Sequence, residues 1–331
     1  MIIDKMKVAI IGSDGFVGTR LKERFQNQGI QYQGFDIVGD ESNSSEYLDV
    51  ENANTFKKIN KYSAIINLAA VHRDDVYPVS RYDDVNIQGA TNVCDAARLY
   101  GINQIIFTSS VAIYGFAPPN TDETGKPNYF NNYGRTKYMA EKVYKDWQAE
   151  APNERTLIII RPTVIFGEGN RGNVYNLLKQ IASKKFVMFG NGRNKKSMAY
   201  VENVVAFIEH TLNITEGLHV YNYIDKPDYD MNRLISFSRN FLMKKNNVGF
   251  RLPAFLGILI GYGFDLISKI FKISLPISSI RVRKFMGTTL FSSNANNLGF
   301  HPPVSLEEGL RKTLRYEFVE NNSDRKTFET E

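Results

Sequence analysis

The 331-residue chain is long enough for one large domain with an appended lobe, and its 43% hydrophobic content predicts a full core with little disorder. Cys94 is the only cysteine, which excludes an internal disulfide, favours a reducing cytosol and argues against a zinc site. The N-terminal stretch MIIDKMKVAIIG lacks the basic and apolar pattern of a signal peptide, so we expect none.

The net charge of +6 is unevenly distributed. Residues 231–316 carry 13 Lys and Arg against three acidic residues, a local charge of +10. Such a region suits an anionic partner: a phosphate-bearing substrate, an anionic membrane or nucleic acid. A solvated basic face is an equally good interpretation of the charge alone.

The first half alternates short apolar runs with amphipathic stretches. KVAIIG, YQGFD, SAIINLAA, QIIFTSS and TLIIIRP are typical of buried strands, and helical patterns cover 85–100 and 131–150. This alternation predicts an α/β fold: a Rossmann-type, doubly wound parallel sheet. We expect a dinucleotide-binding domain at 1–164, a smaller substrate-binding lobe mainly at 165–320 with some segments returning to the first domain, and a polar tail at 321–331.

The stretch IIGSDGFVG places Gly12, Gly15 and Gly18 between a predicted strand and a predicted helix. This arrangement gives a tight turn, a close approach of backbone to a pyrophosphate, and close packing of helix on strand. Asp36 ends the next predicted strand, where its carboxylate can bind the ribose hydroxyls and would repel a 2′-phosphate. The sequence therefore predicts NAD rather than NADP as the cofactor.

Three residues form the predicted catalytic set. Tyr133 and Lys137 lie four residues apart, on one face of a predicted helix, and Ser110 lies at the end of a predicted strand. A nearby ammonium would lower the pKa of the tyrosine, whose hydroxyl could then exchange protons near neutral pH. His72 could be a further polar group of the site, although a lone histidine is more often structural.

Residues 252–274 are unusually apolar, but their longest uncharged run, 252–264, has only 13 residues. A membrane-spanning helix needs about 20 apolar residues, so this stretch should not cross a bilayer. Its second half is amphipathic with basic residues, which suits a helix lying at a membrane surface. The alternative is that residues 252–277 form the core of the C-terminal lobe.

The G-x-x-G-x-x-G spacing, followed by YLDV, NLAA, Asn86 and Y-x-x-x-K, resembles the extended short-chain dehydrogenase/reductase family. The resemblance implies hydride transfer at a sugar alcohol, with Ser110, Tyr133 and Lys137 as catalytic residues. It implies further cofactor contacts by the residues that surround the predicted turn and strand ends: Phe16, Val17, Asp49, Val50, Leu68, Ala69, Ala70, Asn86 and Pro162. It also implies substrate contacts by Ser110, Thr163, Asn173, Lys196 and Arg283.

The resemblance also narrows the reaction. Dehydratases of the family carry Asp and Glu after the residue that matches Ser110, whereas this chain has Val111 and Ala112, which leaves epimerisation or ketone reduction. The stretches TSSVAIYGF, KSMAYVENVVAFIE and GYGFDLISKI are similar to family members that act in O-antigen synthesis on undecaprenyl-diphosphate sugars.

That similarity implies interconversion of lipid-linked GlcNAc and GalNAc by a peripheral enzyme on the cytoplasmic face of the inner membrane, with no role for nucleic acid and with a homodimer as the family's usual state. Lys196 stands where many nucleotide-sugar epimerases have a phosphate-binding Arg. The ammonium of a lysine, which acts as a point charge, thus replaces a guanidinium that could bind a phosphate through two hydrogen bonds. A soluble UDP-sugar 4-epimerase, or a UDP-4-keto-sugar reductase, is the alternative.

Overall fold

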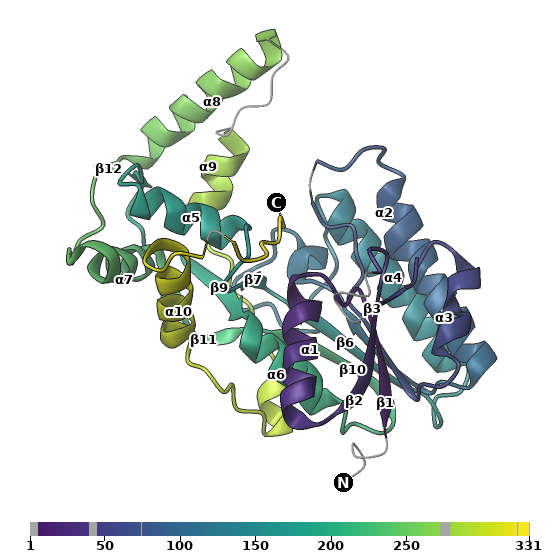
Figure 1. The fold of residues 1–331 in the computed structure, drawn as a ribbon. Coiled ribbons are helices and arrows are strands. Elements are labelled where there is room, and N and C mark those ends of the chain that lie inside the picture. Colours follow the sequence, from purple (N-terminus) through teal and green to yellow (C-terminus); the bar gives the residue numbers. More distant parts are fainter. Residues whose placement is uncertain (1–5, 40–44, 74, 272–278, 323, 331) are drawn as a thin grey trace.

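The protein is described from a computed structural model that covers residues 6–39, 45–73, 75–271, 279–322 and 324–330. Two lobes lie side by side, with a pair of helices projecting from one of them (Figure 1). The larger lobe is a helix-covered sheet, and the smaller one gathers much of the second half of the chain.

A seven-stranded sheet forms the centre of the larger lobe, in the order β10-β6-β5-β4-β1-β2-β3. Every strand pair in it is parallel. This confirms the predicted Rossmann-type sheet, and all five predicted strands are present. The strands are β1 Lys7–Ile11, β2 Gln31–Asp36, β3 Ser45–Tyr47, β4 Ala64–Asn67, β5 Gln104–Thr108, β6 Thr156–Pro162 and β10 Gly217–Tyr223.

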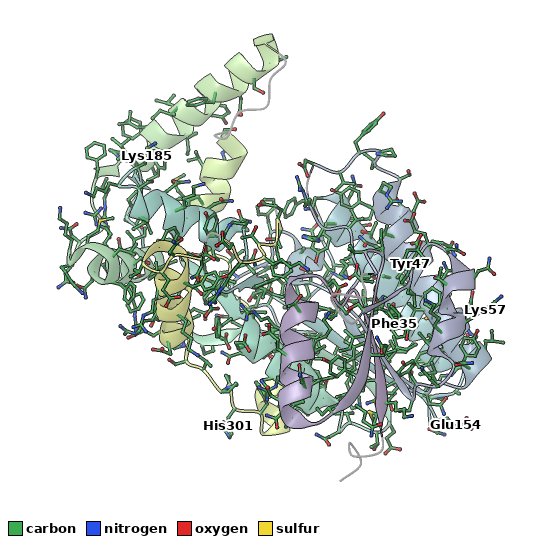
Figure 2. All side chains as sticks on the ribbon, viewed as in Figure 1. Phe35, Tyr47, Lys57, Glu154, Lys185 and His301 are labelled. Carbon is green, nitrogen blue, oxygen red and sulfur yellow. The ribbon has the colours of Figure 1, made fainter. Side chains whose placement is uncertain are left out.

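Helices cover both faces of this sheet, as its buried Ile, Val and Phe side chains require. One face packs against α1 (Phe16–Gln28) and α6 (Val201–Thr211), and the other against α3 (Gly89–Tyr100) and α4 (Asn132–Ala149). Figure 2 shows Phe35, which is fully buried, inside this layer, with Lys57 and Glu154 at its periphery. The shorter segments of the lobe are α2 Arg81–Asp83, the π-helix η4 Asp84–Gln88 and the 3-10 helices η3 Ala53–Ile59, η5 Val111–Tyr114 and η6 Ala295–Leu298.

The chain enters and leaves the sheet several times. Helix α6 and strand β10 come from the second half of the sequence, yet β10 pairs with β6 along its whole length. Segments beyond residue 164 thus complete the first lobe, where the periodicity of the sequence gave only a weak strand signal.

The smaller lobe has a three-stranded sheet in the order β11-β9-β7, with β9 parallel to β7 and antiparallel to β11. Its apolar core includes Phe166, Leu178, Ile235 and Leu310, from the sheet and three packed helices. The elements are β7 Val164–Phe166, β8 Met188–Phe189, β9 Lys195–Tyr200, β11 Asp225–Asp230, β12 Arg251–Leu252, α5 Asn173–Ala182, α7 Met231–Met243 and α10 Leu306–Phe318.

Helices α8 (Ala254–Phe271) and α9 (Ser279–Met286) project from the smaller lobe (Figure 1). Phe255, Leu259 and Tyr262 on α8 are 62%, 60% and 50% exposed. Their i, i+4, i+7 spacing places them on one face of the helix. The first half of α8 therefore exposes apolar side chains rather than forming a core, while the side chains at 266, 267, 270 and 271 and residues 272–277 of the predicted apolar stretch lie outside the described part of the structure. Among the described helices, none has the length and apolar character needed to traverse a bilayer.

Candidate active site

The glycine turn joins β1 to α1 at the carboxyl edge of the sheet. Gly12 has φ +79°, and a Cβ there would lie 2.6 Å from the backbone nitrogen of Ala69. A Cβ on Gly18 would lie 2.4 Å from the carbonyl oxygen of Gly12. Both positions therefore exclude any side chain, because distances below 3 Å to backbone atoms cannot be relieved without moving the chain.

Gly15 is different, because a Cβ at this position would meet its nearest atom at 3.5 Å, an ordinary contact. It is exposed and forms the N-cap of α1, so no side chain covers the first N–H groups of the helix. Packing within the protein does not require a glycine here, whereas a ligand seated on the helix N-terminus would. The turn thus fits a dinucleotide pyrophosphate.

The carboxylate of Asp36 lies beside this turn, at the end of β2. Its Oδ2 accepts a hydrogen bond from the backbone N–H of Asp14 at 2.9 Å, and Oδ1 accepts one from Val38 at 3.3 Å. The side chain is buried. Asp36 is thus held at the strand end, in the place where the sequence predicts a ribose contact.

The other predicted cofactor residues lie along the same edge. Phe16 and Val17 begin α1, and the N–H of Leu68 donates to the carbonyl of Ile11 at 2.9 Å, so the segment Leu68–Ala70 runs beside the glycine turn. Asp49 and Val50 follow β3, joined to β2 by a bond from the Leu48 N–H to the Asp36 carbonyl at 3.0 Å. Pro162 is the last residue of β6.

Asn86 connects the end of β4 to helix α4. Its Oδ1 accepts from the N–H of Val71 at 2.8 Å, and its Nδ2 donates to the carbonyl of Val71 and to Oγ1 of Thr136, both at 2.9 Å. This amide therefore positions α4, which carries Tyr133 and Lys137, against the edge where the cofactor is predicted to bind. These hydrogen bonds of Asn86 are structural, because Val71 directly follows the segment Leu68–Ala70 that is predicted to contact the cofactor.

The structure brings Ser110 and Tyr133 together. Ser110 follows β5 and caps η5 through a bond from the Ala112 N–H to its Oγ at 3.1 Å. A hydrogen bond with the Ser110 side chain lowers the pKa of Tyr133, but burial of the phenol is the larger effect and raises that pKa. Tyr133 is on the first turn of α4, since Asn131 caps this helix by accepting from the Gly134 N–H at 2.9 Å.

Lys137 lies one turn further along α4 and is 1% exposed. Its Nζ is 4.4 Å from the ring centroid of Phe107, and burial lowers its pKa to about 7, against a smaller raising effect of Glu141. The expectation that this ammonium lowers the pKa of Tyr133 is not met in this structure, where burial and Ser110 account for the shift. The physical reason is that the site removes both groups from water, which disfavours both charged forms.

His72 also belongs to this cluster. Its ring stands edge-on to the ring of Tyr133, with centroids 6.5 Å apart. Desolvation lowers the pKa of His72, as does the charge of Lys137, while a bond to the Ala70 carbonyl opposes them. The imidazole is thus favoured in its neutral form, next to the predicted catalytic phenol.

A buried ion pair that the sequence analysis missed supports these residues. Glu141 accepts two hydrogen bonds from Arg161 on β6, at 2.8 and 2.6 Å, and one from the hydroxyl of Ser109 at 2.6 Å. Arg161 also donates to the hydroxyl of Tyr114 at 2.6 Å. The available signal was the position of Glu141, four residues after Lys137 and so on the same helical face.

The predicted substrate residues of the second half are more scattered. Thr163 is buried and donates its N–H to the carbonyl of Tyr223 at 3.1 Å, and Asn173 is the first residue of α5. Lys196 donates to Oγ1 of Thr289 at 3.0 Å, and burial lowers its pKa to about 8. Arg283 donates to the hydroxyl of Tyr262 at 2.5 Å, on the projecting helix pair. These hydrogen bonds of Lys196 and Arg283 reach neither Ser110 nor Tyr133.

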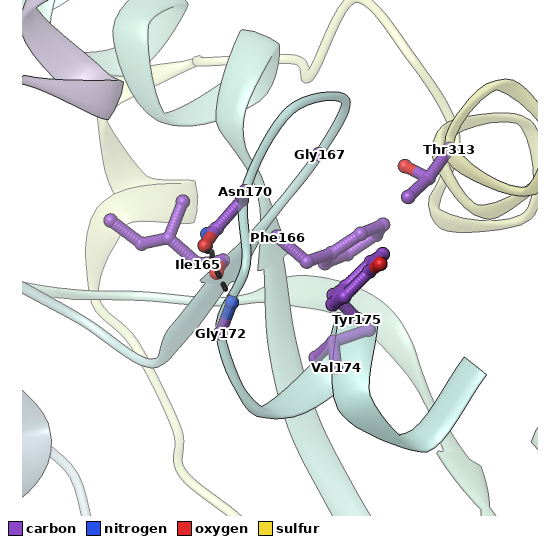
Figure 3. A pocket seen from close by; sticks show the side chains of 8 residues that line it. All are labelled: Ile165, Phe166, Gly167, Asn170, Gly172, Val174, Tyr175 and Thr313. Atoms are coloured by element: carbon purple, nitrogen blue, oxygen red, sulfur yellow. Dashed lines mark hydrogen bonds between the residues drawn. The ribbon is translucent and has the colours of Figure 1, made fainter. Parts of the chain in front are cut away.

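A shallow pocket lies under the loop that connects β7 to α5 (Figure 3). Asn170 shapes this loop, because its Oδ1 accepts from the Gly172 N–H at 2.9 Å and its Nδ2 donates to the Ile165 carbonyl at 3.0 Å. The lining contains none of the predicted catalytic residues; it consists of Ile165, Phe166, Gly167, Asn170, Gly172, Val174, Tyr175 and Thr313. Among the described residues, no cluster of His, Cys, Asp or Glu is arranged to hold a metal ion.

A Rossmann-type sheet, a glycine turn shaped for a pyrophosphate, and a Ser–Tyr–Lys set beside it define an NAD-dependent oxidoreductase-type site. The chain belongs to the NAD dependent epimerase/dehydratase family, whose model matches residues 8–223. NAD is accordingly its cofactor, as predicted.

Curated relatives agree with this assignment. The chain is 47% identical over 330 residues, 98% of its length and 99% of the relative's, to the N-acetyl-alpha-D-glucosaminyl-diphospho-ditrans,octacis-undecaprenol 4-epimerase of Escherichia coli O157:H7. It is 24% identical to the UDP-glucose 4-epimerase of Vibrio cholerae, over 95% of the chain and 96% of the relative.

Solved structures share the fold. The UDP-glucose 4-epimerase of Thermus thermophilus in complex with NAD superposes with a TM-score of 0.71 at 17% identity, covering 94% of this chain and 98% of the other. The UDP-glucose 4-epimerase of Thermotoga maritima with UDP-glucose gives 0.73 at 19% identity, with the same coverage.

Proposed function

We propose that the protein is an NAD-dependent 4-epimerase that interconverts GlcNAc and GalNAc on diphospho-undecaprenol, at the cytoplasmic face of the inner membrane. The observation that carries this proposal is the 47% identity to the Escherichia coli 4-epimerase, which extends over nearly the whole of both chains. The site geometry agrees with the reaction type, and the projecting helix pair agrees with a lipid-linked substrate.

The residues of this chain have clear roles in such a reaction. Tyr133 removes the proton from the sugar hydroxyl and later returns it, while Ser110 holds the reacting oxygen by a hydrogen bond. When bound, NAD supplies the acceptor and the donor of the hydride. Val111 and Ala112, which follow Ser110, carry no acid or base, so the site offers no group at these positions for the elimination of water.

Lys137 contributes through its position one helical turn after Tyr133 on α4. From there it can reach toward a cofactor ribose at the edge of the sheet that carries the glycine turn. Its lowered pKa leaves part of the amine neutral near pH 7, whereas the raised pKa of Tyr133 keeps the phenol protonated, so moving a proton from Tyr133 to Lys137 costs free energy in this structure. Glu141 and Arg161 do not touch the reacting atoms and hold α4 against β5 and β6 instead.

The surface of α8 supports the membrane part of the proposal. Phe255, Leu259 and Tyr262 form an exposed apolar stripe, and Phe250, 65% exposed, lies just before the helix. Burying a side chain of this size in an apolar phase yields about 1.5–3 kcal/mol. Together with the +10 charge of residues 231–316, the stripe suits an anionic lipid surface.

The substrate is tested by incubating purified protein separately with GlcNAc-diphospho-undecaprenol in detergent and with UDP-GlcNAc, and measuring the GalNAc product. We expect conversion of the lipid-linked sugar without net consumption of NAD. Conversion of UDP-GlcNAc alone would overturn the proposal and favour a soluble nucleotide-sugar epimerase. Stoichiometric consumption of NADH with a keto sugar would identify a reductase.

Membrane binding is tested by co-sedimentation with vesicles that contain anionic lipid. The variant Phe255→Ser/Leu259→Ser should lose most of the binding and retain NAD affinity, since both side chains are exposed. Leu99→Ser is the matched control, because Leu99 is 74% exposed on α3, in the other lobe. Equal binding by both variants would contradict the role of α8.

A further inference from the structure

The last residues of the chain return to the active-site side of the molecule. We call residues 324–330 the C-terminal strap. The N–H of Phe328 donates to the carbonyl of Gly169 at 2.9 Å, and its carbonyl accepts from the N–H of Arg171 at 2.8 Å. Thr330 donates to Oδ1 of Asn170 at 2.5 Å. The strap is thus fixed to the loop between β7 and α5, and it lies between the two lobes (Figure 1).

The strap also contacts the glycine turn of the other lobe. Nζ of Lys326 donates to the carbonyl oxygen of Asp14 at 3.0 Å. The ring of Phe328 packs at 5.7 Å, centroid to centroid, against that of Phe16, the first residue of α1. Residues from the far end of the sequence therefore bridge the substrate lobe and the N-terminus of the helix that receives the cofactor.

Lys326 adds a second positive charge at this place. A helix N-terminus carries a partial positive charge, so the two together favour an anion, and the exposed side chain of Lys326 is open to one. Within the described residues, the contacts of Lys326 are a neutral carbonyl and the ring of Phe328, with Nζ 5.1 Å from the ring centroid.

The nearby carboxylates have other partners. Oδ1 of Asp14 accepts from Lys22 at 2.5 Å and from Ser45 at 2.7 Å, and Asp36 accepts from the backbone of the turn. The ion pairs of the loop are likewise formed elsewhere, since Arg171 pairs with Glu317 at 2.6 Å. In the part of the chain that the structure describes, the ammonium of Lys326 is therefore placed at the helix N-terminus with no carboxylate paired to it.

We propose that the C-terminal strap is part of the cofactor site, in which Lys326 binds the pyrophosphate of NAD and the strap retains the dinucleotide. A lysine is a suitable point charge for a phosphate, and it adds to the N–H groups of α1. Retention matters for an epimerase, because the nucleotide that accepts the hydride must still be present when the hydride is returned to the same sugar.

The test is nucleotide binding by calorimetry, on protein stripped of nucleotide and without any sugar. Lys326→Met should weaken NAD binding roughly ten- to hundredfold, the range for a hydrogen bond to a charged group, and leave binding of adenosine unchanged. Lys326→Arg should restore most of the affinity. Lys312→Met is the matched control, since Lys312 is an exposed lysine on α10.

A second variant, truncated after Asn322, should release NAD faster in gel filtration while its fluorescence and thermal unfolding stay near those of the full chain. Unchanged NAD affinity in Lys326→Met would overturn the proposal, as would an equal loss for adenosine. Tighter NAD binding by the truncated chain would show that the strap obstructs the site instead. Because no lipid substrate is used, none of these outcomes depends on the proposed sugar.

Discussion

Breaking the ion pair between Glu141 and Arg161 should cost the larger lobe much of its stability. The Glu141 side chain is 0% exposed and is bonded twice to Arg161 and once to Ser109. Glu141→Gln keeps the side-chain volume and removes the negative charge. It also replaces one carboxylate oxygen by an NH2 group, which cannot accept a hydrogen bond from the guanidinium of Arg161. Leaving one buried charge uncompensated costs about 3–5 kcal/mol, so the unfolding equilibrium constant should rise by roughly two to four orders of magnitude.

Trp147 provides the assay. It is the only tryptophan of the chain and is fully buried in α4, six residues after Glu141, so its fluorescence follows unfolding of this layer. Urea titrations of the nucleotide-free protein give the free energy of unfolding by linear extrapolation. Arg161→Met should be similarly destabilising, and the double variant should cost clearly less than the sum of the two, because no charge remains buried alone.

The control is Glu150→Gln, at the end of the same helix. Glu150 pairs with Arg98 and Arg155 on the surface, where ion pairs contribute little, so the urea midpoint should stay nearly unchanged. A loss below about 1 kcal/mol for Glu141→Gln, or strict additivity of the two core variants, would refute the reasoning from desolvation.

The remaining predictions concern the glycine turn and the catalytic helix. Gly15→Ala should unfold like the wild type but bind NAD more weakly in calorimetry. Gly18→Ala should lower the melting temperature, since its Cβ would lie 2.4 Å from the carbonyl oxygen of Gly12. Equal effects of the two variants on stability would contradict the assignment of the turn. Tyr133→Phe should reduce the epimerisation rate at least about a hundredfold with NAD affinity retained, and near-normal turnover would exclude it as the proton-transfer group. Burial lowers the pKa of Lys137 from its usual 10.5 to about 7, so between these values the unfolded chain binds more protons at this site. The wild type should accordingly gain stability relative to Lys137→Met from about pH 7 to about pH 9.5 in urea titrations, and parallel pH profiles would exclude the lowered pKa.

Local sequence patterns predicted the parts of the molecule that local interactions determine. The glycine turn is specified by steric exclusion at Gly12 and Gly18, and the shared face of Tyr133 and Lys137 follows from helical periodicity. Buried apolar runs likewise predicted β1, β2, β4, β5 and β6.

Long-range features were not predictable in the same way. Strand β10 alternates too weakly to show that it pairs with β6, and Glu141 and Arg161 meet across 20 residues of sequence. The pKa of Tyr133 depends on how much water the folded site excludes, which no spacing reveals. Composition could not decide whether α8 is core or surface, because that depends on what packs against it.

The way the chain passes between the lobes has a mechanical consequence. Three of its crossings have one residue or none between regular elements. Thr163 alone separates β6 from β7, and Ile224 alone separates β10 from β11. Strand β9 ends at Tyr200 and α6 begins at Val201. Domain closure needs hinge residues that are free to change their backbone angles, and these three short crossings offer few of them, although the crossings at 287–294 and 299–305 are longer. We therefore expect the two lobes to keep a nearly constant separation during the reaction. The enzyme would then select its sugar by the fixed shape of the site, and the keto intermediate would rotate within a site of that shape.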